Sequence, residues 1–344
     1  MGVDMDYTVA MQRAIALSEK GLGKTSPNPI VGAVIIDDAG NVIGEGFHDR
    51  MKSKDHAEVV AIVNANQNGN KINGATIVVT LEPCNHSGST GPCTQAIIDA
   101  GISTVVFAVN DPNSVASGGA DTLRAAGIKV IDGVLKAEAA YANRAWLMKI
   151  KKNRPFFTWK VATTLDAKIA ALDGTSKWIT NETSRADVQV LRRQSDAILV
   201  GTNTVITDDP HLIPRGDFTS YSHNPIRVIC GEQELPKDAK VFDEAAQTVV
   251  VKSKDLDLLV QKLNELKINH VFVEAGPTLA SAMVDHCLMD ELVIYQAPSL
   301  LGSGKPFFAF DYQTTISDQM RLDHISTVVL DGDVKSVYHI RNGE

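Results

Sequence analysis

Residue types that can bind zinc and carry protons are grouped in the first half of the chain. His56-Ala57-Glu58 precedes Pro83-Cys84, and Cys93 follows after an intervening segment of eight residues. One imidazole and two thiolates are three of the four ligands of a tetrahedral zinc site, which leaves the fourth position for water. Zinc lowers the pKa of a bound water, and a carboxylate can carry its proton. The pattern predicts His56, Cys84 and Cys93 as metal ligands and Glu58 as a catalytic general acid/base.

A structural zinc site is the alternative, and it would close with a fourth protein ligand. His86, two residues after Cys84, is the candidate for that position. A carboxylate two residues after the histidine, at the start of an expected helix, is typical of zinc nucleobase deaminases and favours a catalytic site. We therefore expect His86 to contact substrate or its own loop. Asn28, held between Pro27 and Pro29, is suited to reading a heterocycle edge, although an ordinary turn would look the same.

Alternating helices and strands must position these residues. Apolar spacing predicts helices at 7–20, 57–65 and 94–100, a hairpin of strands 31–36 and 42–47, and strands at 76–80 and 104–109. A further helix is expected before Gly127. Strands that alternate with helices predict a sheet covered by helices.

The pattern changes near the basic run Lys149 to Arg154, after which Pro155 opens a new strand. We place a domain boundary there, with domains 1–150 and 151–344. Strands are expected in the second half at 156–162, 197–200, 225–229, 248–251, 270–273 and 291–297, with helices between them. The length suits two domains, and the fold class is α/β for both.

Charge and cysteine content narrow the function. The first 150 residues hold 12 basic against 15 acidic residues and the remainder 21 against 26, so neither half has the basic surface of a nucleic-acid-binding protein. No apolar run approaches the length of a membrane span, and the acidic N-terminus does not look like a secretory signal. We expect a cytoplasmic protein. Its other cysteines, Cys230 and Cys287, lie in apolar segments and are expected in the core.

The second half has no Gly-x-Gly-x-x-Gly after a strand. Its best phosphate-binding candidate is the expected strand 270–273 followed by Glu274-Ala275-Gly276-Pro277-Thr278, because free N–H groups at a helix start attract phosphate. A simple strand-to-helix turn is equally compatible with these residues.

Longer motifs identify a resemblance. Thr80 to Gly88 together with Gly91-Pro92-Cys93 resembles the deaminase half of the bifunctional riboflavin biosynthesis deaminase/reductase family, as do Asn28 in its Thr-Ser-Pro-Asn-Pro setting and Val109 to Asn113. Cytidine-type and RNA-editing deaminases usually have two residues between their cysteines. The reductase half is matched at Lys160 to Asp166, Trp178 to Thr180, Asp187 to Arg192, Gly201 to Pro210, Glu274 to Leu279 and Leu300 to Gly302.

This resemblance implies a cytidine-deaminase-like α/β/α domain followed by a dihydrofolate-reductase-like α/β domain that uses NADPH. It implies zinc-dependent hydrolytic deamination of a phosphorylated diaminopyrimidinone, then reduction of its ribosyl group to ribityl. The implied cofactor contacts are Ala162, Trp178, Thr204, Asp208, Gly276, Pro277, Thr278, Leu279, Ala280, Ser281 and Ala282. The substrate contacts are Asn28, Lys160, Ser176, Arg192, Leu212, Arg215 and Glu274, with Arg192 and Arg215 suited to a ribose phosphate.

Two positions depart from the family pattern. Ala167 stands where Gly usually follows Leu-Asp, and Cys230-Gly231 stands where an Asp-Ser-like pair is common. The rival interpretation is an RNA- or nucleoside-directed zinc deaminase with a non-catalytic nucleotide-binding C-terminal domain. We expect a small-molecule enzyme without nucleic-acid or membrane partners that forms a homo-oligomer, a dimer or a tetramer.

Overall fold

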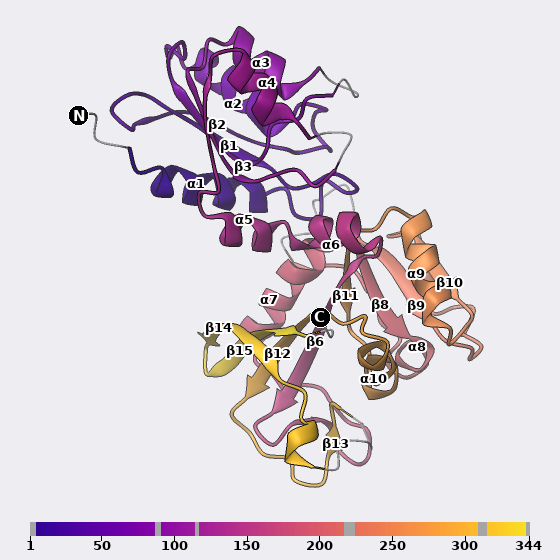
Figure 1. Ribbon diagram of the computed structural model, residues 1–344. Coiled ribbons are helices and arrows are strands. Elements are labelled where there is room, and N and C mark those ends of the chain that lie inside the picture. The colour runs from indigo at the N-terminus through magenta and orange to yellow at the C-terminus, as the bar shows by residue number, and fades with distance from the viewer. Residues whose placement is uncertain (1–4, 87–90, 114–116, 217–223, 309–314, 342–344) are drawn as a thin grey trace. The chain divides into compact units, whose positions relative to one another are not determined.

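The computed structural model describes residues 5–86, 91–113, 117–216, 224–308 and 315–341 (Figure 1). The chain divides into two compact units, Met1–Asn153 and Arg154–Glu344, and each is described by itself. The predicted boundary near 150 falls in the last turn of helix α6 (Arg144–Lys152). That helix ends because Asn153 adopts a left-handed conformation, with φ of 51°, and Pro155 follows.

The first unit is a five-stranded sheet between two layers of helices. Its elements are α1 (Thr8–Glu19), β1 (Gly32–Ile36), β2 (Val42–Phe47), α2 (Ala57–Gln67), β3 (Thr76–Leu81), α3 (Cys93–Asp99), β4 (Thr104–Val109), α4 (Gly119–Ala125), β5 (Lys129–Asp132), α5 (Lys136–Ala142) and α6. The strand order is β2-β1-β3-β4-β5. β1 pairs antiparallel with β2 and β3, whereas β3, β4 and β5 are parallel. The predicted hairpin, strands and helices of this half are confirmed.

Alternating side chains of the strands fill two cores, as the period of two in a strand requires. Ile35, Ile77 and Phe107 pack with α2, α3 and α4 on one face. Val34, Val78 and Val106 pack with α1, α5 and α6 on the other. Figure 1 shows these two helical layers on opposite sides of the sheet.

The second unit is built on an eight-stranded mixed sheet. Its elements are β6 (Phe156–Thr164), β7 (Lys168–Ala170), α7 (Glu182–Arg193), β8 (Ala197–Gly201), α8 (Thr202–Asp208), β9 (Ile226–Cys230), η1 (Lys240–Phe242), β10 (Thr248–Val251), α9 (Leu256–Glu265), β11 (His270–Val273), α10 (Pro277–Asp285), β12 (Glu291–Ala297), β13 (Lys305–Pro306), η2 (Ile316–Asp318), β14 (Leu322–Leu330) and β15 (Asp333–Ile340). The sheet order is β10-β9-β8-β11-β6-β12-β15-β14, and β7 pairs with β13 in a separate two-stranded ribbon.

Strands β6 and β8 to β12 run parallel, so their carboxyl ends lie at one edge of the sheet. Helices α9 and α10 cover one face around Leu199, Val271 and Met283. Helix α7 covers the other through Val188, which packs with Phe272 and Tyr295. The six strands expected in this half are confirmed, whereas β7, β13, β14 and β15 were not expected from the sequence.

Candidate zinc centre and reductase site

Local structure brings the predicted zinc ligands to the ends of three elements. Helix α2 begins at Ala57, so His56 is its N-cap residue and Glu58 lies in its first turn. Cys93 opens helix α3, and Cys84 lies three residues beyond the end of β3. Gly46 allows the start of α2 to lie close to β2, since a Cβ on Gly46 would be 2.3 Å from the carbonyl oxygen of Ala57. The helix start is therefore held beside the sheet.

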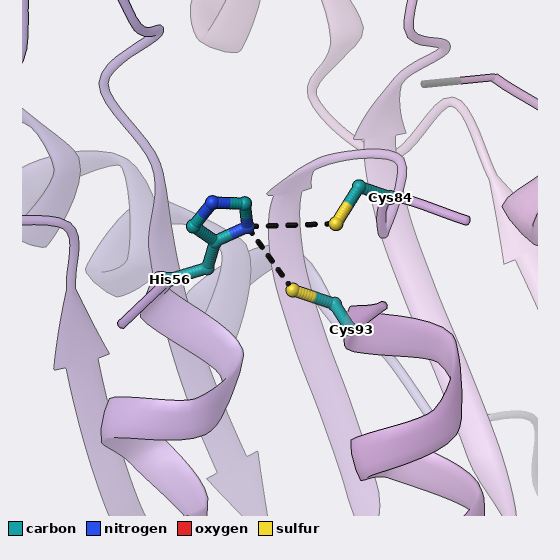
Figure 2. Close-up of side chains that lie close together, drawn as sticks. All are labelled: His56, Cys84 and Cys93. Atoms are coloured by element: carbon teal, nitrogen blue, oxygen red, sulfur yellow. Dashed lines mark hydrogen bonds between the residues drawn. The ribbon is translucent and has the colours of Figure 1, made fainter. Parts of the chain in front are cut away.

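The three donor atoms have the spacing of a metal site. Nδ1 of His56 lies 3.5 Å from Sγ of Cys84 and 3.3 Å from Sγ of Cys93 (Figure 2). Among the residues described, these three form a group whose donor atoms all lie within 4.8 Å of one another, and His86 is not part of it. Adjacent N and S ligands of a tetrahedral zinc ion are separated by about 3.5 Å. The arrangement thus fits zinc with three protein ligands and one open position.

The electrostatics of the site suit metal binding and proton transfer. The adjacent Cys93 sulfur and the His56 ring lower the pKa of Cys84 to about 4, which favours the thiolate that a metal requires. Glu58 is only 3% exposed, and burial raises the pKa of its carboxyl. A carboxyl with a raised pKa is suited to taking up and returning a proton near neutral pH.

The donor group opens into a cavity of about 310 Å³, which is within the range of small-molecule sites. Its lining includes the predicted residues Asn28, His56, Glu58 and Cys84. It also includes residues that were not predicted as site residues, namely His48, Glu82, Asp111 and Asn113, and it contains His86. Nδ1 of His86 is buried, and within the described ranges it has no hydrogen-bond partner. His86 therefore lines the cavity outside the three-donor group, and its contact with substrate or with its own loop stays a prediction.

His48 determines how Asn28 is oriented. Nδ1 of His48 lies 2.9 Å from the carbonyl oxygen of Asp55, which can only accept, so Nδ1 is the donor. Burial lowers the pKa of His48, and in the neutral ring Nε2 is an acceptor. The Asn28 Nδ2 group 3.3 Å away is then the donor. The amide oxygen of Asn28 is consequently the acceptor that remains for a ligand.

Glu82 connects the Cys84 loop to two other loops. Its carboxylate accepts hydrogen bonds from the backbone N–H groups of Asp111, at 3.2 Å, and Ala120, at 3.0 Å. Gly119 allows this close approach, because a Cβ there would be 1.9 Å from the carbonyl oxygen of Pro83. Glu82 and Asp111 both belong to motifs that carry the family resemblance, but those motifs did not indicate that the two residues contact each other.

In the second unit, the predicted residues gather at the carboxyl ends of the parallel strands. Ala162 lies near the end of β6, Thr204 and Asp208 lie on α8 directly after β8, and Glu274 follows β11. Gly276 is the N-cap of α10, and Pro277 is its first residue. This edge is where open α/β sheets bind their ligands.

A largely buried ion-pair network lies at this edge, with side chains that are 9% exposed for Glu274, 13% for Arg192 and 20% for Lys160. Glu274 accepts from Arg192, with Nη2 at 2.5 Å and Nε at 3.0 Å, and its other oxygen is 3.3 Å from Nζ of Lys160. Burial alone would raise the pKa of Glu274, but Arg192 and Lys160 lower it to about 2. Nη1 of Arg192 also donates to the carbonyl oxygen of Ile213. These three residues were predicted as separate contacts from the sequence, and they lie together in the structure.

The remaining predicted reductase residues differ in accessibility. Ser176, Trp178 and Arg215 are exposed. The side chain of Leu212 is 2% exposed and packs in a core cluster with Val205 and Val241. Ala280 and Ser281 of α10 are also buried, although Ser281 Oγ has no hydrogen-bond partner among the residues described.

Comparison with known proteins covers both units. The cytidine and deoxycytidylate deaminase zinc-binding region matches residues 5–109, and the RibD C-terminal domain matches residues 155–335. The chain is 42% identical over 326 residues to the riboflavin biosynthesis protein RibD of Aquifex aeolicus, covering 88% of this chain and 89% of the relative. It is 43% identical over 295 residues to the RibD of Mycobacterium tuberculosis, covering 85% of each. This chain belongs to the RibD family of riboflavin biosynthesis proteins.

A solved RibD-type structure supports the assignment across both units. The Thermotoga maritima protein described as a diaminohydroxyphosphoribosylaminopyrimidine deaminase/5-amino-6-(5-phosphoribosylamino)uracil reductase is 35% identical. It superposes with a TM-score of 0.88, covering 97% of this chain and 98% of its own. The chain is therefore a bifunctional enzyme of riboflavin biosynthesis with a zinc-binding deaminase domain and a reductase domain. The rival interpretation with a non-catalytic C-terminal domain is not supported.

Both departures from the RibD pattern have a local consequence. Ala167 adopts a φ of 62°, in the left-handed region that favours glycine. Gly231 has a φ of 139°, and a Cβ there would lie 2.6 Å from Oγ1 of Thr202, so the backbone itself requires glycine.

Cys230 is buried as expected, but the expectation of a core position for Cys287 is wrong, because it is exposed. Cys287 has a left-handed φ of 52° in the turn after α10, between the end of the helix and the buried Leu288 and Met289. No helix in the described part of the chain is long and apolar enough to cross a membrane.

Proposed function

We propose that the first unit deaminates 2,5-diamino-6-(5-phosphoribosylamino)pyrimidin-4(3H)-one and that the second unit reduces the ribosyl group of the product to ribityl with NADPH. The observation that carries the first half is a three-donor zinc set beside a buried carboxylate in a ligand-sized cavity. The second half rests on the largely buried Lys160–Glu274–Arg192 network at the carboxyl edge of the sheet.

Glu58 is the proton carrier of the deamination. His56, Cys84 and Cys93 would hold zinc, which would supply a water of lowered pKa to the cavity. Glu58 would take one proton from that water and pass it to a ring nitrogen, and would then carry the second proton, from the added hydroxyl, to the departing amine, which leaves as ammonia. The amide oxygen of Asn28 accepts from an N–H at the pyrimidine edge, since its Nδ2 group is directed to His48.

In the reductase unit, residues position the reactants more than they transfer protons. NADPH is the hydride donor, and the dinucleotide is bound by Ala162, Trp178, Thr204, Asp208 and the segment from Gly276 to Ala282. Glu274 holds the Lys160 ammonium at the edge of the sheet, where Lys160 and Asp208 are the polar groups proposed to act on the ribosyl group. The exposed Ser176 and Arg215 complete the substrate site, to which Leu212 would contribute through its backbone because its side chain packs in the core. Because the donors of Arg192 are directed to Glu274 and to the carbonyl oxygen of Ile213, we assign the substrate phosphate first to the exposed Arg215.

The two activities are tested separately with Glu58→Gln. We measure ammonia release from the diaminopyrimidinone substrate and the loss of NADPH absorbance with the deaminated substrate. The variant is expected to lose the first activity and to keep the second. Ammonia release at the wild-type rate by Glu58→Gln contradicts the role of Glu58. A zinc-loaded, folded wild-type protein that does not oxidise NADPH contradicts the reductase proposal.

We also propose a cytoplasmic homo-oligomer, a dimer or a tetramer. Four free cysteines suit a reducing compartment. Strand β14 lies at the edge of its sheet and exposes Ile325, Val328 and Val329, which is the kind of edge that another copy can cover. Light scattering on the purified chain measures the oligomeric state, and a monomer at micromolar concentration would contradict this proposal.

A further inference from the structure

The indole of Trp178 lies on a segment with little contact to the rest of its unit. Each residue from Leu172 to Trp178 is exposed, and Trp178 itself is 65% exposed. A side chain that is free to rotate loses conformational entropy when it stacks on a ligand, and this loss weakens binding. A neighbouring group that already fixes the plane of the ring removes part of this cost.

Arg185 is such a group. The central carbon of its guanidinium lies 4.6 Å from the centroid of the Trp178 ring, within the range of a cation–π contact. Its Nη1 donates a 2.5 Å hydrogen bond to the carbonyl oxygen of Thr180, two residues after the tryptophan. The guanidinium thus contacts both the indole and the backbone that carries it.

The start of α7, from which Arg185 projects, is itself anchored. The side chain of Asn181 donates to the carbonyl oxygens of Leu330, at 2.7 Å, and Asp331, at 2.9 Å, in the turn between β14 and β15. The buried carboxylate of Asp333 accepts from the backbone N–H of Asn181 and from Oγ of Ser184, at 2.8 and 2.7 Å. Arg185 therefore extends toward Trp178 from a fixed point on the sheet.

We propose that Arg185 is a positioning residue for cofactor binding. It covers one face of the Trp178 indole and holds the ring so that the opposite face stacks on an aromatic ring of the nicotinamide dinucleotide. Arg185 acts through Trp178 and makes no contact with the cofactor. This inference rests on the proposed function of the reductase unit.

Dissociation constants for NADPH, measured on the full-length protein, test the proposal. Arg185→Gln is expected to weaken binding about fivefold, the effect of losing a partly exposed cation–π contact. Arg185→Lys keeps the charge but loses the flat group, so its effect is expected to lie between those of wild type and Arg185→Gln. Arg341→Gln, which removes another paired arginine of the same unit, is the matched control and should leave binding unchanged.

A double-mutant cycle separates positioning from direct contact. If Arg185 acts through Trp178, adding Arg185→Gln to Trp178→Ala weakens NADPH binding no further than Trp178→Ala alone. If Arg185→Gln weakens NADPH binding by the same factor in the Trp178→Ala variant as in the wild type, Arg185 binds the cofactor itself, and this would overturn the proposal. Binding of 2′,5′-ADP and of reduced nicotinamide mononucleotide then shows which ring stacks, since only one of the two fragments should respond to Arg185→Gln.

Fluorescence of the cofactor-free protein gives a readout independent of activity. Trp146 and Trp159 are 6% and 2% exposed, so quenching by acrylamide reports mainly on Trp178. Arg185→Gln is expected to increase the quenching without changing the melting temperature. Unchanged quenching together with unchanged NADPH affinity overturns the proposal while leaving the reductase assignment intact. A folded wild-type protein that does not bind NADPH overturns both. If Arg185→Gln does not fold, Arg185→Lys carries the same comparisons.

Discussion

Nε and Nη2 of Arg192 both donate to a single carboxylate oxygen of Glu274, at 3.0 and 2.5 Å, although the two residues are 82 positions apart in the sequence. The other carboxylate oxygen of Glu274 faces Lys160. A buried carboxylate between two cations holds both in place, and the loss of a carboxylate of this kind leaves two unpaired charges.

Glu274→Gln is therefore expected to destabilise the reductase unit by about 3 kcal/mol, because Lys160 and Arg192 lose their buried counter-charge. NADPH oxidation should fall with it, while ammonia release should persist. Denaturant unfolding and the two activity assays measure these effects. Glu232→Gln, which removes an exposed partner of Lys254, is the control and should change stability by less than about 0.5 kcal/mol. Equal stability of wild type and Glu274→Gln would contradict the network.

The same carboxylate predicts a pH dependence. The pKa of Glu274 is about 2 in the folded protein, below its ordinary value of 4.5. A depressed folded pKa contributes stability above the unfolded value, and the contribution is lost as the pH falls from 4.5 toward 2. The difference in unfolding free energy between wild type and Glu274→Gln should be constant at neutral pH and shrink below about pH 4.5. A difference that grows on acidification would show that the sign is wrong.

Removal of zinc should separate the two activities. Dialysis against a chelator is expected to abolish ammonia release, because only three protein donors, His56, Cys84 and Cys93, would hold the metal. Activity should return with zinc and not with magnesium, since thiolates select zinc. NADPH oxidation with the deaminated substrate should not change. Metal analysis of Cys93→Ser, with Cys230→Ser as the matched control, should show loss of zinc only in the first, and equal zinc content in both would contradict the ligand assignment.

Ala167→Gly should stabilise the protein. Ala167 adopts a φ of 62°, which costs a residue with a Cβ about 1 kcal/mol, and glycine recovers part of that cost. We expect a net gain of about 0.5 kcal/mol after the extra backbone entropy of glycine is included. Ala170→Gly in strand β7 is the control, and it should destabilise instead. A loss of stability in Ala167→Gly would mean that contacts of the methyl group outweigh the strain. Thermal melting of both variants measures the difference.

The sequence by itself determined the zinc chemistry. The ligand types and their short motifs can be recognised without knowledge of the fold. Each ligand lies at the end of a local element: His56 precedes a helix, Cys93 opens a helix and Cys84 follows a strand. The central strands were equally predictable, since Val34, Val78 and Val106 alternate with residues that face the opposite core. Both signals are local, and a local pattern can be read from neighbouring positions.

Strand β14 shows where local patterns fail. Its residues from His324 to Val329 are all exposed, so it lacks the alternation that marks a half-buried strand. Its place beside β15 follows from backbone pairing and not from burial.

Only the tertiary structure decided which polar groups meet. Several contacting groups are far apart in the sequence, and the length of chain between them does not predict their contact. They are Asn28 with His48, Glu82 with Ala120, and Glu274 with Lys160 and Arg192. Arg192 and Arg185 show the same dependence. Arg192 was expected to bind a ribose phosphate and no role was expected for Arg185, whereas in the fold Arg192 pairs with the carboxylate of Glu274 and Arg185 lies over the exposed indole of Trp178. The function of a charged side chain depends on the groups that surround it, and the packing of the folded chain determines which groups those are.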